Sequence, residues 1–108
     1  MNISAKRKLV VVQLTGGNDY LNCVVPYNDP IYFDSRKNVG IAEDKVLPID
    51  NGLGLNPGMG PIKDLYDQGK VAIVHGVGYP DPNRSHFRSM DIWHTAEPTT
   101  VGLSLIHI

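Results

Sequence analysis

The sequence predicts an α/β protein built on a parallel sheet, with the order strand, helix, helix, strand, helix. Residues 9–14 and 71–74 are almost continuously apolar, which is typical of strands that are covered on both faces. Signals for helix starts lie between and after these two runs. Strands that are joined by helices in this way pair in parallel, through right-handed crossovers.

The first predicted strand, residues 8–14, contains three successive valines and ends at a Gly-Gly-Asn turn, residues 16–18. Glycine and asparagine tolerate the positive φ that a sharp exit turn requires. Asp29 followed by Pro30 is the pattern of an N-cap and a first helical position. This pair predicts a short helix through about residue 37.

A short extended piece is predicted over residues 46–49, and its proline confines it to a sheet edge or a loop. The second helix follows Asn56-Pro57, which repeats the cap-and-proline signal, and Gly69 stands where a glycine commonly closes a helix. The apolar positions at helical spacing are Met59, Ile62, Leu65 and Tyr66. Pro61 fits only within the first turn of this helix, so the sequence leaves the starting residue open.

The second predicted strand is residues 71–75, and a third helix follows it. Either Asn83 or Ser85 is expected to cap this helix, because both side chains accept hydrogen bonds from the first helical N–H groups. The helix is expected to end at about Thr95.

Composition excludes several classes of partner. The net charge of −1 over 108 residues gives no electrostatic footprint for nucleic acid or an anionic membrane surface. No apolar stretch reaches the roughly 20 residues that a membrane helix needs. Cys23 is the single cysteine, so an intrachain disulfide is excluded and the compartment stays undetermined.

Two buried-type strands are too few for a stable doubly wound sheet. We therefore expect residues 8–98 to be the N-terminal part of a larger domain, whose missing C-terminal part is a partner of this chain. Residues 1–7 are expected to be a lead-in. Residues 99–108 are expected to be a tail outside the domain, and residues 102–108 resemble translated sequencing-adapter read-through.

A series of motifs carries a family resemblance that covers roughly residues 8–98. The motifs are LVVVQLTGGNDYLN at 9–22, VPY at 25–27, DP at 29–30, LNP at 55–57, GKVAIVH at 69–75 and PNRSHF at 82–87, with Asp91 and Trp93 after them. In this order they resemble the N-terminal part of the proteins catalogued as domain of unknown function 1501. Those bacterial proteins are similar to the alkaline phosphatase and sulfatase superfamily, which hydrolyses phosphate or sulfate esters at a metal site. Similar proteins are often exported to the periplasm, although this chain shows no twin-arginine leader.

The resemblance implies a metal ligand at Asp19, because the first strand of the superfamily ends in a metal-binding aspartate. Asn18 and Asn22 are candidates for holding the anion or orienting this carboxylate, and the alternative is that Asn18 is a turn residue and Asn22 a loop cap. The alternative is that Asp19 only stabilises its turn through the side chain. The expected metal in the full-length protein is a divalent ion such as zinc, calcium or magnesium.

Arg84 and Ser85 are the candidates for anion binding and nucleophilic attack. Exposed N–H groups at a helix start favour an anion, and an arginine offers two parallel donors to phosphate or sulfate. The sulfatase signature is Cys or Ser, any residue, Pro, Ser, Arg, and here Pro80 stands where the nucleophile belongs. Either Ser85 has taken that role, or it is a plain N-cap and there is no nucleophilic side chain, in which case a metal-bound water would attack. His86 is a further candidate base or ligand, and the alternative for it is a structural role.

The resemblance, together with these residues, therefore implies a fragment of a metal-dependent hydrolase that acts on a small anionic ester, a phosphate or a sulfate. The fragment alone is expected to hold no metal and to be inactive. The alternative is a catalytically silent, secreted binding or assembly protein on the same fold. A dinucleotide site at the glycine-rich residues 52–58 is disfavoured, because Pro57 replaces the third glycine.

Overall fold

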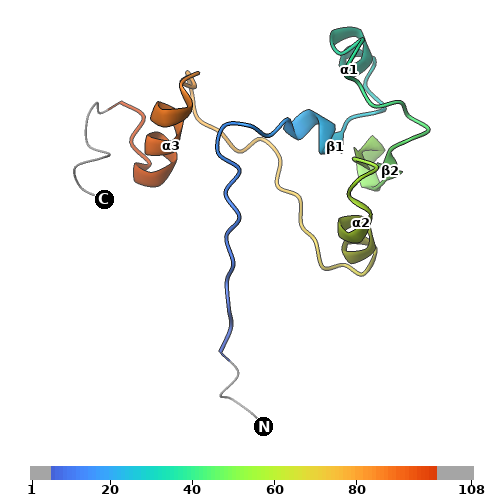
Figure 1. The fold of residues 1–108 in the computed structure, drawn as a ribbon, viewed down its shortest axis with the longest axis horizontal. Coiled ribbons are helices and arrows are strands. Elements are labelled where there is room, and N and C mark those ends of the chain that lie inside the picture. The colour runs from blue at the N-terminus through green and yellow to red at the C-terminus, as the bar shows by residue number, and fades with distance from the viewer. Residues whose placement is uncertain (1–5, 100–108) are drawn as a thin grey trace. The chain divides into compact units, whose positions relative to one another are not determined.

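The computed structural model describes residues 6–99, which form two compact units (Figure 1). One unit is Asp19–Val77. The other consists of residues 6–18 together with residues 78–99. Most of the predicted lead-in and tail, residues 1–5 and 100–108, lies outside the described residues.

The unit Asp19–Val77 contains a small antiparallel sheet. Its strands are β1 (Val24–Val25), β2 (Leu47–Pro48) and β3 (Gly54–Leu55), and β3 lies in the middle. Leu55 of β3 pairs with Val24 on one side and with Leu47 on the other. Pro48 lies in an edge strand, where a residue without a backbone N–H is tolerated. The prediction of a short edge piece at residues 46–49 is confirmed.

The core of this unit lies around the sheet. Val25 and Leu55 are fully buried, and Tyr32 and Val46 are each 5% exposed. Gly54 allows this packing, because a Cβ atom at that position would lie 2.7 Å from Cβ of Val46. A short 3₁₀ turn, η1 (Tyr20–Asn22), precedes β1, and a second, η2 (Asp50–Gly52), connects β2 to β3.

Helix α1 (Pro30–Ser35) begins where its sequence signal predicts. The Asp29 carboxylate accepts a hydrogen bond from the N–H of Ile31 at 2.9 Å, and Pro30 occupies the first turn. The helix is slightly shorter than expected, because Arg36 leaves the helical conformation and serves as the C-cap.

Helix α2 (Gly60–Asp67) begins later than the signal at Asn56 implies. The Asn56 side chain instead closes a turn by accepting from the N–H of Gly58 at 2.9 Å. The helix end is as predicted: Gly69 has φ +72°, and its N–H donates to the carbonyl of Tyr66 at 2.9 Å. The N–H of Lys70 donates to the carbonyl of Leu65 at 3.0 Å, which completes a Schellman motif.

Helix α3 (His86–Thr95) belongs to the other unit, and it confirms the prediction of a third helix. Of the two candidate caps, Ser85 is the N-cap, since its Oγ accepts from the N–H of Arg88 at 3.4 Å. The Asn83 side chain forms a turn before the helix, because its Oδ1 accepts from the N–H of Ser85 at 2.8 Å. The helix ends at Ala96, which has φ +57°.

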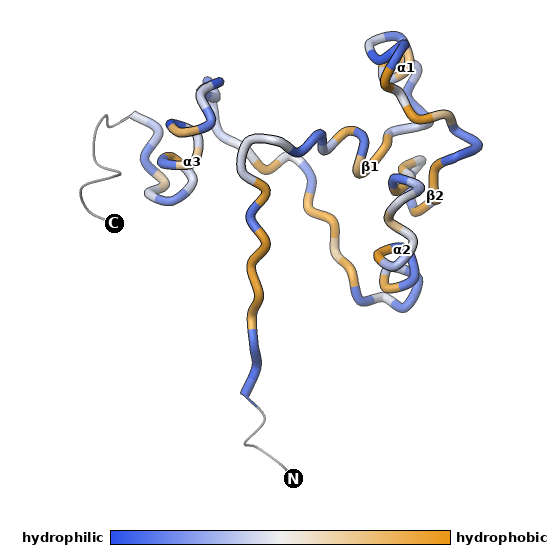
Figure 2. Tube along the Cα trace, in the orientation of Figure 1, coloured by the Kyte–Doolittle hydropathy of each residue, from blue (hydrophilic) through white to orange (hydrophobic). Residues whose placement is uncertain are grey.

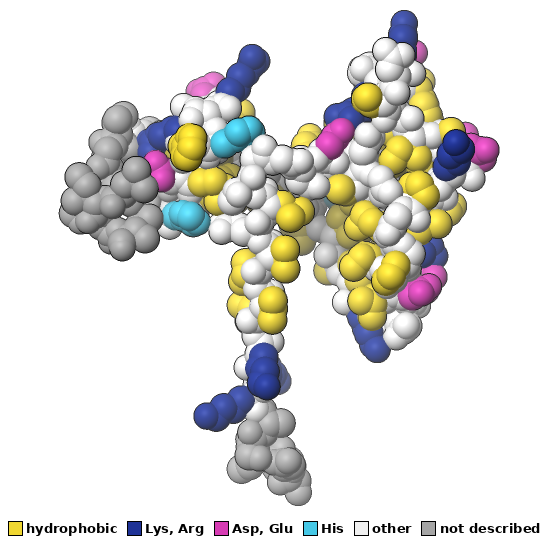
Figure 3. All heavy atoms as spheres, in the orientation of Figure 1, with side chains coloured by type: hydrophobic (Ala, Val, Ile, Leu, Met, Phe, Trp, Pro, Cys, Tyr) yellow, Lys and Arg dark blue, Asp and Glu magenta, His cyan; other side chains and the backbone are white. Residues whose placement is uncertain are grey.

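The two predicted parallel strands are not formed in the structure. The five apolar residues of 9–14 are 65–87% exposed. Figure 2 shows this run as a hydrophobic stretch of the N-terminal segment, and Figure 3 shows hydrophobic side chains along it. Backbone groups of residues 9–14 and 71–75 make no hydrogen bond to any other described residue. A strand that is apolar on both faces is stable only between neighbours, and the sheet of this chain is made from other residues. The larger parallel-sheet domain therefore stays a prediction.

Candidate functional site

The carboxylate of Asp19 is held by Arg36. Nη1 of Arg36 lies 2.6 Å from Oδ2 of Asp19, and Nη2 lies 2.9 Å from Oδ1. This is a bidentate, charge-assisted pair, which is the strong geometry for arginine and a carboxylate. The hydrogen bond from Arg36 lowers the pKa of Asp19 below its ordinary value, so the carboxylate stays ionised.

The end of α1 places Arg36 for this contact. As the C-cap residue, Arg36 donates its N–H to the carbonyls of Tyr32 and Phe33, and its own carbonyl accepts from Gly40 at 2.8 Å. Both carboxylate oxygens of Asp19, which the resemblance assigns to a metal, are engaged by Arg36 in this structure. A metal ion at Asp19 would have to compete with the guanidinium group.

The side-chain amide of Asn22 connects loops of its unit through hydrogen bonds from its nitrogen and to its oxygen. Its Nδ2 donates to the carbonyl of Val39 at 2.9 Å, and its Oδ1 accepts from the hydroxyl of Tyr32 at 2.7 Å. The same hydroxyl accepts from the N–H of Ile41 at 2.8 Å. Nδ2 of Asn56 donates to the backbone carbonyl of Asn22 at 2.7 Å.

Sequence reasoning gave Asn22 two alternatives, a contact with the anion or Asp19 and a loop cap, but it did not find this network. Its members lie far apart along the chain, and no local pattern links them. The available signal was the presence of amide side chains at two loop positions, Asn22 and Asn56. In the structure, the contacts of Asn22 are those of a structural residue.

The start of α3 brings together three of the predicted site residues, Arg84, Ser85 and His86. As N-cap, the Ser85 hydroxyl uses one lone pair, and its proton and second lone pair remain for another partner. The Arg84 side chain is exposed and makes no hydrogen bond or ion pair to any described residue. His86 lies against the turn at Gly16, where a Cβ atom would be 2.8 Å from Cγ of the imidazole.

A groove of about 540 Å³ runs between this turn and α3. Its lining residues are Thr15, Gly16, His86, Phe87, Met90, Asp91 and His94. The Nε2 atom of His94 lies 3.2 Å from Nε2 of Gln13, so this imidazole is tied to the extended N-terminal segment. The groove carries two imidazoles and one carboxylate in a largely apolar wall.

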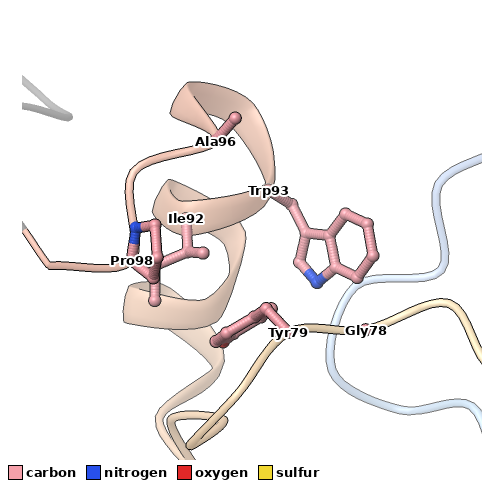
Figure 4. A pocket seen from close by; sticks show the side chains of 6 residues that line it. All are labelled: Gly78, Tyr79, Ile92, Trp93, Ala96 and Pro98. Atoms are coloured by element: carbon pink, nitrogen blue, oxygen red, sulfur yellow. The ribbon is translucent and has the colours of Figure 1, made fainter.

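A second, smaller pocket lies on another side of α3 (Figure 4). The rings of Tyr79 and Trp93 meet edge to face there, with centroids 6.3 Å apart. Ile92 is buried beside them, and the hydroxyl of Tyr79 accepts from the N–H of Asn83 at 3.3 Å. These contacts anchor the segment before α3 onto the helix, which is a packing role.

The predicted site residues are divided between the two units. Asp19 and Asn22 belong to the unit Asp19–Val77, whereas Asn18, which is exposed, belongs with the three residues at the start of α3. Among residues 6–99 there is no group of three or more His, Cys, Asp or Glu side chains that could hold a metal ion. None of the described helices is long and apolar enough to span a bilayer.

Comparison of the chain with known protein families, with curated proteins and with solved structures found no match.

Proposed function

We propose that residues 8–98 are the N-terminal part of a metal-dependent hydrolase that cleaves a small phosphate or sulfate ester. Asp19 would hold a divalent metal ion in the full-length protein, Arg84 would bind the anionic group, and Ser85 would attack it. Asn18, Asn22 and His86 would lie around this centre. The proposal includes a larger parallel-sheet domain, similar to that of alkaline phosphatase, which supplies the remaining metal ligands.

The observation that supports this proposal is the arrangement at the start of α3. Ser85 is the N-cap of a ten-residue helix, and Arg84 directly precedes it. The first N–H groups of a helix attract anions, and an exposed arginine adds two donors with the geometry of a phosphate or sulfate. Because capping occupies one lone pair of the hydroxyl, it does not prevent Ser85 from attacking an ester.

A catalytically silent binding or assembly protein on the same fold is the second candidate. The Asp19–Arg36 pair favours it, since both carboxylate oxygens already have a partner. The proline at position 80, where the sulfatase signature has its nucleophile, favours it as well. A fold of this kind can persist after its chemistry is lost.

Two substitutions of Ser85 separate a nucleophile from an N-cap in the full-length protein. Ser85→Asn keeps a good cap but removes the hydroxyl, whereas Ser85→Ala removes both and costs α3 about 1 kcal/mol. If Ser85 attacks the ester, both variants lose hydrolysis of aryl phosphates or sulfates, while only Ser85→Ala weakens the helix. Activity that survives in Ser85→Asn would overturn the nucleophile assignment.

Anion binding can be tested on the 108-residue chain itself. Titration with inorganic phosphate or sulfate should shift the amide resonances of residues 85–88, and Arg84→Ala should weaken the response. Arg7→Ala is a matched control, because it also removes one arginine charge, but at a position far along the sequence from the start of α3. Equal responses in both variants, or no shift in the unsubstituted chain, would contradict the role of Arg84.

Substitution of Asp19 tests the metal assignment. In the full-length protein, Asp19→Ala should weaken metal binding by roughly 10-fold or more. Removing a residue that only hydrogen-bonds to a metal ligand already has an effect of that size. Retention of both metal and activity in this variant would leave the silent binding protein as the better explanation.

A further inference from the structure

We draw no further inference here: the strongest candidate, the exposed apolar run at residues 9–14 of the extended N-terminal segment, carries no proposal because nothing in the structure shows what covers it.

Discussion

Arg36 engages both carboxylate oxygens of Asp19, at 2.6 and 2.9 Å, across 17 positions of the chain. The contact joins the turn before η1 to the end of α1 within the unit Asp19–Val77. Both side chains remain partly exposed, at 49% for Asp19 and 21% for Arg36. Water therefore screens the pair, and its main effect is on the charge state and orientation of Asp19.

Arg36→Ala should raise the pKa of Asp19 towards its ordinary value, because the hydrogen bond from Arg36 is the main cause of its depression. Carboxyl-carbon NMR titration of the full chain measures this directly. Lys37→Ala is the matched control, since it removes the neighbouring cation, which forms no ion pair with Asp19. An unchanged pKa in Arg36→Ala would show that the pair is not formed in solution.

The same pair should make stability depend on pH in a definite direction. The pKa of Asp19 is lower in the folded unit than in the unfolded chain, so the folded unit binds fewer protons. Its stabilisation is complete above the ordinary pKa of an aspartate and is lost as pH falls through the lowered value. Urea titrations at several pH values should therefore show Asp19→Asn approaching the unsubstituted chain as the solution becomes acidic.

Tyr32→Phe should destabilise the unit Asp19–Val77 by about 1 kcal/mol, which is the usual net contribution of a hydrogen bond, because the partners of the hydroxyl are only partly buried. The substitution removes the hydroxyl that serves both Asn22 and the N–H of Ile41. Tyr20→Phe is the control, because Tyr20 is 70% exposed. Urea unfolding, monitored by the amide NMR intensities of this unit, should give a lower midpoint for Tyr32→Phe than for Tyr20→Phe. Equal midpoints would contradict the network.

Gly54→Ala should destabilise the unit Asp19–Val77, whereas Gly17→Ala should not. At Gly54 the added methyl group would lie 2.7 Å from two atoms of Val46, and such overpacking typically costs about 1–3 kcal/mol. At Gly17, nothing lies within 4 Å of the added atom, and the backbone is not in the left-handed region. Alanine at Gly17 should therefore leave the stability almost unchanged. The urea midpoints of the two variants decide the matter, and a stable Gly54→Ala would mean that β2 and β3 are not packed as described.

Hydrogen exchange should distinguish the paired from the unpaired backbone. The amides of Val10, Val11 and Val12 have no hydrogen-bond acceptor among the described residues and should exchange at the rate of an unfolded peptide. The amides of Asn56 and Ile41, which donate to Cys23 and to the Tyr32 hydroxyl, should exchange more slowly. Strong protection of the three valines in a monomer would show that the segment pairs with other structure.

The 108-residue chain alone should bind neither zinc nor calcium at micromolar concentration, and it should not hydrolyse aryl phosphates or sulfates. Asp19 is engaged by Arg36, and a metal held by one or two ligands without supporting groups binds weakly. Calorimetric titration with each metal, and a colorimetric ester assay, test this. Tight binding by the chain would show that its ligand set is larger than we propose.

The helices could be predicted from the sequence because their signals are local. Each signal acts on residues within one helical turn, and each has the expected contact in the structure. These signals are the N-cap Asp29 with Pro30, the N-cap Ser85 and the closing glycine Gly69. The start of α2 was left open by the sequence, and the structure decides it: the Asn56 side chain satisfies the N–H of Gly58 in a turn, and the helix begins at Gly60 with Pro61 in its first turn. An asparagine before a proline is compatible with both arrangements.

The sheet could not be predicted in the same way, because strand pairing depends on residues far apart in the chain. Val24–Val25 and Gly54–Leu55 are too short to show a period. Residues 9–14 have a strong pattern but pair with no strand among residues 6–99. The same limit applies to the candidate site. Neighbouring residues were enough to name Ser85 as one of two possible caps of α3, but the partner of Asp19 lies 17 positions away.

The exposed run at residues 9–14 also bears on how the chain behaves at high concentration. It is rich in β-branched residues, uncharged, and free of proline and glycine, which are the properties of segments that stack into fibrils. Stacking in register would bring Lys6, Arg7 and Lys8 of neighbouring copies together, and their repulsion opposes it. Salt screens that repulsion. The highest concentration at which the chain stays monomeric should therefore fall as the ionic strength rises, and not depend on temperature alone.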